Sequence, residues 1–150
     1  MHIEIESLVA APPAAVFAVT TDIARWPGVI SAIQHIDVLT PGPVGIGTRF
    51  RETRMMLGRK ATEEMTVTEL VPPERFVLTA FNHGTRYRAE HLFRAVAGGT
   101  QLRLVFVGVP ETLAARLLTP LGWLMRGTVM RQLEADFADL KRAAEAGMRT

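Results

Sequence analysis

The chain has 150 residues, 48% of them hydrophobic and 21% charged, and it contains no cysteine. This composition is typical of one globular domain and excludes disulfide bonds and thiolate metal sites. The formal net charge is only +2, and arginines alternate with glutamates along the chain, which argues against a nucleic-acid-binding surface. We therefore expect a single domain over residues 1–150.

The chain shows no targeting or membrane signal. Its first residues lack the basic start and the apolar run of a signal peptide. The most apolar segment, residues 113–125, is interrupted by Arg116 and Pro120, and no apolar stretch reaches the roughly 18 residues that a membrane span needs. These features predict a soluble, cytoplasmic protein without an integral membrane segment.

The N-terminal part predicts one strand and two short helices. Residues 2–9 alternate between apolar and polar side chains, as in a half-buried strand. A proline pair then precedes a short helix over residues 14–20, where proline is favoured in the first turn. Asp22 is a suitable N-cap for a second short helix over residues 23–26.

Residues 34–109 show the alternation of short strands and turns that is typical of consecutive antiparallel hairpins. Glycine-, proline- and asparagine-rich turns separate short alternating segments, and residues 82–84 (Asn-His-Gly) form a typical hairpin turn signal. This regular spacing of short strands argues against βαβ units. The predicted strands cover residues 34–40, 48–56, 60–70, 75–81, 85–96 and 101–109.

A long helix is predicted at the C-terminal end. Residues 111–118 form a short helical piece, and Thr119 and Pro120 can serve as N-cap and first position of a longer helix that stops near Gly147. Apolar residues recur there at spacings of three and four, with Asp136 and Asp139 on the other side. The stripe consists of Met130, Leu133, Phe137, Leu140 and Ala144.

This order of elements predicts an α+β fold. A curved antiparallel sheet of about seven strands needs its concave face covered, and only the C-terminal helix is long enough to cover it. One helix cannot fill the whole concavity. We therefore expect an apolar cavity between the sheet and the C-terminal helix.

Five short segments resemble the helix-grip superfamily, also called START-like or SRPBCC, and most closely its polyketide cyclase/dehydrase-like subgroup. They occur in the order and spacing of that family and extend over nearly the whole chain. The resemblance implies the helix-grip fold with an internal cavity, but these are fold motifs and assign no reaction. The segments are residues 11–17, 22–27, 45–50, 67–76 and 98–102.

Four polar side chains are candidates for catalysis or for orienting a ligand. His91 and Tyr87 share a strand face with one phenylalanine, and Glu52 and Arg54 share a strand face with another, so all four face the cavity if these phenylalanines are in the core. His91 could act as a general base, Glu52 could accept a proton and Arg54 could hold a carboxylate or enolate oxygen. The alternatives are a hydrogen-bonded structural His91, a half-buried Tyr87, and charges at the open rim.

The apolar lining is expected from three strand faces and from the helical segment that follows them. Residues 113–130 are rich in large apolar side chains and could form a bent core helix, a mobile cavity lid or a dimer contact. The predicted cavity residues are Phe50, Tyr87, His91, Phe93, Leu104, Phe106, Leu117, Leu121, Trp123, Met130 and Phe137.

Three functional hypotheses follow from these patterns. The first is binding of a small hydrophobic ligand that is lipid-like, aromatic or polyketide-like. The second is a cyclase or dehydratase that uses the polar cavity residues without a metal or nucleotide cofactor, because the sequence has no phosphate loop, nucleophile elbow or metal-ligand cluster. The third is a ligand-binding regulatory or stress-response protein that acts as a homodimer.

Overall fold

The computed structural model describes residues 1–149 and contains one antiparallel sheet of seven strands, with the strand order β1-β7-β6-β5-β4-β3-β2. Each strand except β1 pairs with the strand that precedes or follows it in the chain, and β1 joins the sheet beside β7. The strands are β1 (His2–Val9), β2 (Ile33–Val38), β3 (Arg49–Met56), β4 (Arg59–Val71), β5 (Arg75–Asn82), β6 (Thr85–Val96) and β7 (Gly99–Pro110).

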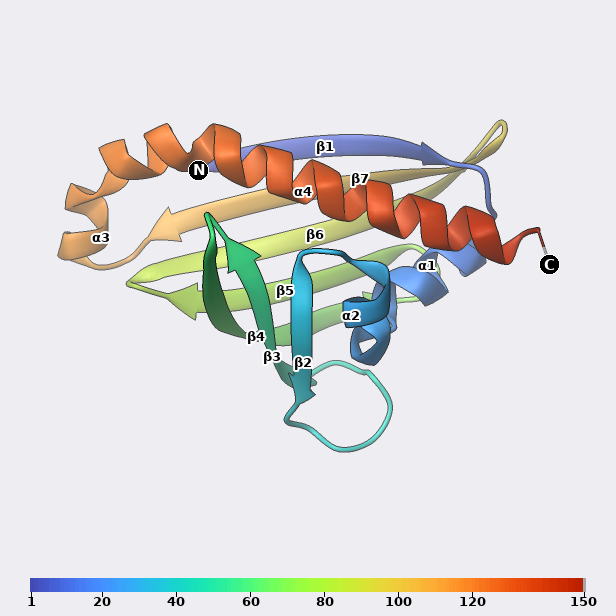
Figure 1. Ribbon diagram of the computed structural model, residues 1–150, viewed down its shortest axis with the longest axis horizontal. Coiled ribbons are helices and arrows are strands. Elements are labelled where there is room, and N and C mark those ends of the chain that lie inside the picture. The colour runs from blue at the N-terminus through green and yellow to red at the C-terminus, as the bar shows by residue number, and fades with distance from the viewer. Residues whose placement is uncertain (150) are drawn as a thin grey trace.

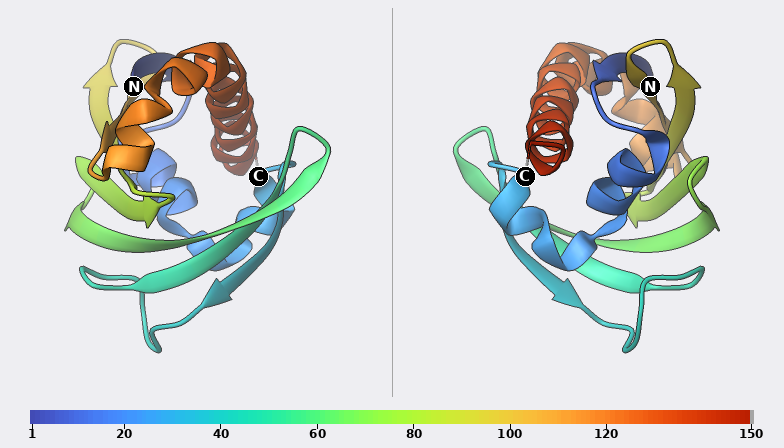
Figure 2. Two further views of the ribbon diagram at one scale, coloured as in Figure 1. Left: turned by 90° about the vertical axis from the view of Figure 1, so that its left-hand side faces the viewer. Right: turned by 90° about the vertical axis from the view of Figure 1, so that its right-hand side faces the viewer.

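The helices lie on the concave side of this sheet. The sheet curves into an open trough, and the long helix α4 lies along its mouth (Figure 2). The short helices follow β1 and fill one end of the trough, while α3 lies at the opposite end of the molecule (Figure 1). The helices are α1 (Pro13–Thr21), the 3₁₀ turn η1 (Ile23–Arg25), α2 (Trp26–Val29), α3 (Leu113–Leu117) and α4 (Thr119–Gly147).

The predicted α+β fold is therefore confirmed, including the two short helices after the first strand and the long C-terminal helix. The hairpin turn at residues 82–84 is also confirmed. His83 and Gly84 both have positive φ angles, of 49° and 76°, as a tight two-residue turn between right-twisted strands requires. No helix within residues 1–149 is long and apolar enough to cross a membrane.

Aromatic side chains on the concave face close one end of the trough. Phe50 of β3 packs edge-on against Trp26, with ring centroids 5.5 Å apart, and Phe93 of β6 packs in the same way against Phe17, at 5.1 Å. All four side chains are at most 8% exposed. These contacts leave the middle of the concave face, under α4, unfilled.

The structure corrects one prediction about α4. Asp136 and Asp139 were expected on the side opposite the apolar stripe, but both are buried. Asp139 accepts a hydrogen bond from the backbone N–H of Ser31 at 2.8 Å and pairs with Arg142, so it joins α4 to the segment before β2. Each aspartate has a partner on another element, and this is why a polar residue is tolerated on the buried side of the helix.

Candidate ligand-binding cavity

A cavity of about 180 Å³ lies between the concave face of the sheet and α4. Its wall is mostly apolar and includes Met65, Leu78, Leu104, Phe106, Leu133 and Leu140. Five further wall residues are polar or charged, and we call them the polar cluster: Glu52, Arg54, Glu63, Gln132 and Asp136. An apolar chamber with a few convergent polar groups is the usual form of a small-molecule site.

Arg54 is the centre of the polar cluster. Its Nε donates to Glu52 Oε1 at 2.5 Å, and its Nη2 donates to Asp136 Oδ2 at 3.0 Å. The three side chains are only 16%, 5% and 12% exposed, in the order Arg54, Glu52, Asp136. The alternative of charges at a water-exposed rim is therefore wrong, because Glu52 and Arg54 form a buried ion pair.

Burial shifts the protonation of both carboxyl groups that contact Arg54. It raises the pKa of Glu52 and the pKa of Asp136, although the Arg54 guanidinium works in the opposite direction at both sites. Glu63 lies directly across from Glu52 in the β3–β4 pairing and raises the Glu52 pKa further through its own charge. Within residues 1–149, Oδ1 of Asp136 is buried without a hydrogen-bond partner.

His91 lies on the cavity wall between two phenylalanine rings. Its ring centroid is 5.4 Å from that of Phe76 and 6.2 Å from that of Phe137. Burial lowers the pKa of His91 to about 4, so the imidazole is neutral at physiological pH. Nδ1 lies 3.2 Å from the carbonyl oxygen of Phe76, which can only accept, so Nδ1 carries the proton and Nε2 is an acceptor.

The structure brings together some of the residues expected in the cavity. Besides Glu52, Arg54 and His91, the apolar side chains of Leu104, Phe106 and Phe137 lie on the wall. Other expected residues lie elsewhere on the concave face. Phe50 and Phe93 belong to the solid core beside the short helices, and Tyr87 stacks on Phe106 at 5.7 Å and covers Gly108 instead of lining the cavity.

The expectation that the whole region from Leu117 to Phe137 closes over the cavity is met only in its later part, and not by Leu117 of α3 or by the start of α4. Leu117, Leu121 and Trp123 are 73%, 54% and 75% exposed and contribute nothing to the cavity wall. Met130 lies on another side of α4, in a shallow groove beside β1. The reason is geometric: the first turns of α4 extend past the start of β1, so they have no sheet beneath them (Figure 1).

Sequence reasoning missed three members of the polar cluster, namely Glu63, Gln132 and Asp136. A signal for Asp136 was present in the spacing. It lies three residues after Leu133 and four before Leu140, so it shares the helix face of two residues already assigned to the core. Glu63 could be found only from the strand register, which places it opposite Glu52.

The polar cluster does not form a metal site. Within residues 1–149, no three His, Asp or Glu side chains are arranged to hold a metal ion. The carboxylates of Glu52 and Asp136 both pair with the Arg54 guanidinium, which already supplies the positive charge that a cation would bring. The polar side chains on the cavity wall can form hydrogen bonds and transfer protons.

A curved seven-stranded sheet gripping a long helix around a lined cavity defines this chain as a helix-grip protein. A family model described as "Polyketide cyclase / dehydrase and lipid transport" matches residues 1–145, and the chain belongs to this family. The resemblance found in the sequence is therefore confirmed. A search of curated proteins found no match.

Solved structures share the fold at low sequence identity. The Zhui aromatase/cyclase from Streptomyces sp. R1128 is 18% identical, with 97% of this chain and 93% of that chain covered and a TM-score of 0.79. The di-domain ARO/CYC StfQ from the steffimycin biosynthetic pathway is 14% identical, with 99% and 52% covered and a TM-score of 0.81. Ara h 8.0201 is 20% identical, with 97% and 98% covered and a TM-score of 0.78. At these identities the likeness establishes the fold alone.

Proposed function

We propose that the chain binds a small hydrophobic ring compound of aromatic or polyketide-like character in the cavity between the sheet and α4. The observation that carries the proposal is an apolar chamber of about 180 Å³ with one polar cluster on its wall. An apolar protein cavity of about 150 Å³ accommodates benzene, so a ligand of one or two rings fits this volume. The family description, which combines polyketide cyclases, dehydrases and lipid transport, supports the same ligand class.

The test is direct binding with a variant that fills the chamber. Ala89 of β6 lies on the cavity wall, whereas Ala95 of the same strand is exposed. Titration calorimetry with naphthalene, and native mass spectrometry for a co-purified compound, should detect binding to the wild type and to Ala95→Trp. Binding should be lost in Ala89→Trp, because the indole occupies the space of the ligand. Equal binding by Ala89→Trp would contradict the proposal.

A second candidate function is a cyclase or dehydratase reaction, and the observation that favours it is an acid and a base on the same cavity wall. Neutral His91 presents Nε2 as a general base, and Asp136 would supply the acid, since burial raises its pKa and so favours the protonated form. In a dehydration, Nε2 would take a proton from the carbon beside a ketone while Asp136 protonates the departing hydroxyl group, which leaves as water. Arg54 would hold Asp136 in position.

This reaction can be tested with a cyclic β-hydroxy ketone that fits the chamber. Mass spectrometry would follow the loss of water. The wild type should accelerate this loss, and both His91→Asn and Asp136→Asn should abolish the acceleration. If either variant retains the full rate while still binding the ketone, the reaction does not use this acid–base pair.

A further inference from the structure

The hydrogen-bond donors on the cavity wall are largely committed within the protein. The Thr20 hydroxyl donates to the carbonyl oxygen of Val16, and the Trp26 indole N–H donates to the carbonyl oxygen of Thr20. His91 uses Nδ1–H on a backbone carbonyl, and Gln132 uses its amide nitrogen on the carbonyl oxygen of Met55. A ligand in the cavity therefore meets mainly acceptors.

The acceptors, in contrast, are not all used. Asp136 Oδ1 is buried with no partner in residues 1–149, and the neutral His91 ring leaves Nε2 as an acceptor. Arg54 has spare N–H donors, because Glu52 and Asp136 occupy two of its five, and the Gln132 amide has a second N–H besides the one that it donates to Met55. A group that both donates and accepts can satisfy Asp136 and Arg54 together.

The charges on the cavity wall also favour a neutral ligand group. Three carboxyl groups, from Glu52, Glu63 and Asp136, share the wall with the single guanidinium of Arg54, which pairs with two of them, Glu52 and Asp136. If Glu52 and Asp136 are both ionised, their two negative charges exceed the single positive charge of the guanidinium. If one of them is protonated, the negative charge of the other still balances the guanidinium. No positive charge remains to compensate the burial of a ligand carboxylate, which is very costly when unpaired.

We propose, on the basis of the ligand binding inferred above, that this cavity selects a neutral hydroxylated ring compound over a carboxylate of the same skeleton. The hydroxyl group donates to Asp136 and accepts from a spare N–H of Arg54. Fatty acids and aromatic acids are thereby disfavoured, although a lone arginine in a cavity suggests an acid-binding site.

Titration calorimetry at neutral pH with naphthalene, 2-naphthol and 2-naphthoate tests this selection. 2-Naphthol should bind about tenfold or more tightly than 2-naphthoate, since one hydrogen bond to a charged group contributes on that scale. Asp136→Asn should lower the affinity for 2-naphthol by about tenfold and leave the affinity for naphthalene nearly unchanged. Glu134→Gln, an exposed position on the same helix, is the matched control.

If Asp136→Asn fails to fold, a second variant, Glu63→Gln, can test the same selection. Glu63→Gln removes one negative charge from the wall and should raise the 2-naphthoate affinity by about threefold or more. Equal or tighter binding of 2-naphthoate by the wild type would overturn the selection while leaving ligand binding intact. Failure of all three compounds to bind would instead contradict the proposed function itself.

A different observation, on the outer surface, carries a second proposal. Six side chains of α3 and the start of α4 are between 54% and 81% exposed, and we call them the apolar ridge. They are Leu113, Leu117, Leu118, Leu121, Trp123 and Leu124. Isolated exposed apolar residues are ordinary, but a contiguous group of this size marks an interaction surface.

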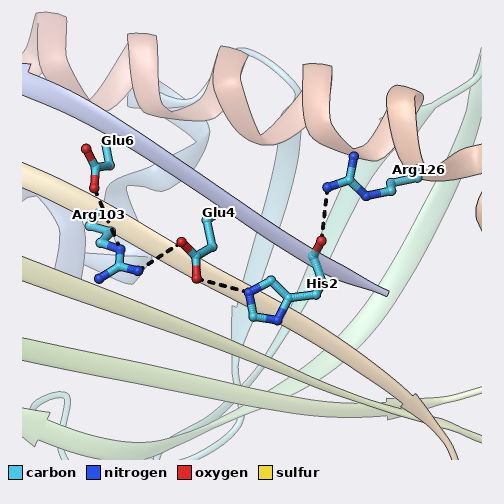
Figure 3. A network of polar contacts seen from close by, with 5 residues as sticks. All are labelled: His2, Glu4, Glu6, Arg103 and Arg126. Carbon is cyan, nitrogen blue, oxygen red and sulfur yellow. Dashed lines mark hydrogen bonds and ion pairs between the residues drawn. The ribbon is translucent and has the colours of Figure 1, made fainter.

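The charged residues within the chain segment of the apolar ridge have one sign. No acidic residue occurs between Glu111 and Glu134, whereas Arg116, Arg126 and Arg131 lie in this interval. None of these three arginines pairs with a carboxylate in the part of the chain that the structure describes. Arg126 donates to the carbonyl oxygen of His2 at 3.1 Å, while the nearby carboxylates Glu4 and Glu6 pair with Arg103 (Figure 3).

We propose that the apolar ridge docks on an anionic lipid surface. A helix with exposed leucine and tryptophan can bury these side chains in the interfacial plane of such a membrane without spanning it. Its arginines, which pair with no carboxylate within residues 1–149, can then contact the anionic head groups. A second copy of the chain fits less well. A symmetric dimer would place the same arginines against one another, with no acidic residue on the ridge to compensate them.

Vesicle flotation tests this docking. The full chain should bind vesicles of phosphatidylglycerol and phosphatidylcholine in equal parts, and bind pure phosphatidylcholine about tenfold or more weakly. The double variant W123S/L124S should lose about tenfold or more of this binding. Leu8→Ser is the matched control, since Leu8 is 54% exposed near the far end of β1. Failure to bind anionic vesicles, equal binding to neutral vesicles, or a dimer that W123S/L124S dissociates would overturn the proposal.

Discussion

Arg54 shows how a single residue compensates the charges of a cavity wall. It contacts Glu52 on its own strand and Asp136 on α4, so one guanidinium holds together the sheet and the helix that covers it. Within a low-dielectric wall, two carboxylates without this cation would have to be protonated or become hydrated. The residue is therefore structural as well as a potential contact for a ligand.

Replacing Arg54 by leucine should destabilise the fold by about 3 to 5 kcal/mol at neutral pH, because two buried carboxylates lose their counter-charge. The loss should shrink in acid, where protonated carboxyl groups need no cation. Chemical denaturation at two pH values measures both effects. Arg51→Leu is the control: Arg51 is exposed on the other face of β3, and its replacement should change stability by no more than about 0.5 kcal/mol. Equal effects of the two substitutions would contradict this role of Arg54.

His91 makes stability depend on pH in a defined direction. Its pKa is lowered from 6.5 to about 4 in the fold, so between these values the unfolded chain binds a proton that the folded chain does not. This residue should therefore lower the free energy of unfolding by about 3 kcal/mol as the pH falls from 6.5 to 4. The raised pKa values of Glu52 and Asp136 act in the opposite direction, so the effect must be isolated by comparison with a variant.

The comparison is between the wild type and His91→Asn, whose amide can still donate to the Phe76 carbonyl. The wild type should lose stability relative to the variant over that pH range, and NMR should show the His91 ring neutral with its proton on Nδ1 until about pH 4. A ring that titrates near 6.5 would show that the imidazole is hydrated and that it is not held in the wall as described.

At the scale of elements, the end of the β6–β7 hairpin is packed against the end of β1. Gly99 has φ +145°, and a Cβ there would lie 2.0 Å from the carbonyl oxygen of Val9. Gly98 also has a positive φ, of +87°, but open space surrounds its missing side chain. A substitution at Gly98 would therefore cause backbone strain alone, whereas a substitution at Gly99 would cause backbone strain and a steric clash.

Gly99→Ala should cost about 2 kcal/mol or more, because it combines an unfavourable φ with a clash against backbone. Gly98→Ala should cost only about 1 kcal/mol from φ alone. Thermal or chemical unfolding of both variants gives the comparison. If the two costs were equal, the contact between Gly99 and β1 would have no energetic consequence.

The long helix α4 has two parts with different surroundings. From Val129 onward its inner side lies on the cavity wall and the core, and two aspartates on that side have partners on other elements. Before Val129 it passes the edge of the sheet and leaves its apolar side chains exposed. Apolar residues of α4 therefore pack in the core after Val129 and lie on the outer surface before it.

At the scale of the whole molecule, the cavity is lined by side chains from the concave face of the sheet and from the helices that cover it, including α1, α2, α4 and the six strands β2 to β7. A ligand that binds there stabilises the entire fold and not one element. With 2-naphthol at a free concentration one hundred times its Kd, the free energy of unfolding should rise by about 2.7 kcal/mol. Ala89→Trp should show no such rise, and a rise in that variant would place the binding site outside the cavity.

The sequence by itself determined the element order and the antiparallel hairpins, because hydrophobic period and turn residues are local signals. The helix-grip fold followed from this order together with the family resemblance of the five segments. The sequence also made Glu52, Arg54 and His91 candidates for the cavity wall, since side chains alternate along a strand, but it left open whether they face the cavity or solvent. These features depend on residues close together in the chain.

Only the tertiary structure decided what those side chains meet. Asp136 lies 82 positions after Arg54 in the chain, and their contact exists because the curved sheet brings β3 under α4. The exposure of Leu117, Leu121 and Trp123 likewise follows from where the sheet ends, which no periodicity in the helix encodes. Burial, charge pairing and pKa depend on distances between remote segments, and those distances are properties of the packed fold.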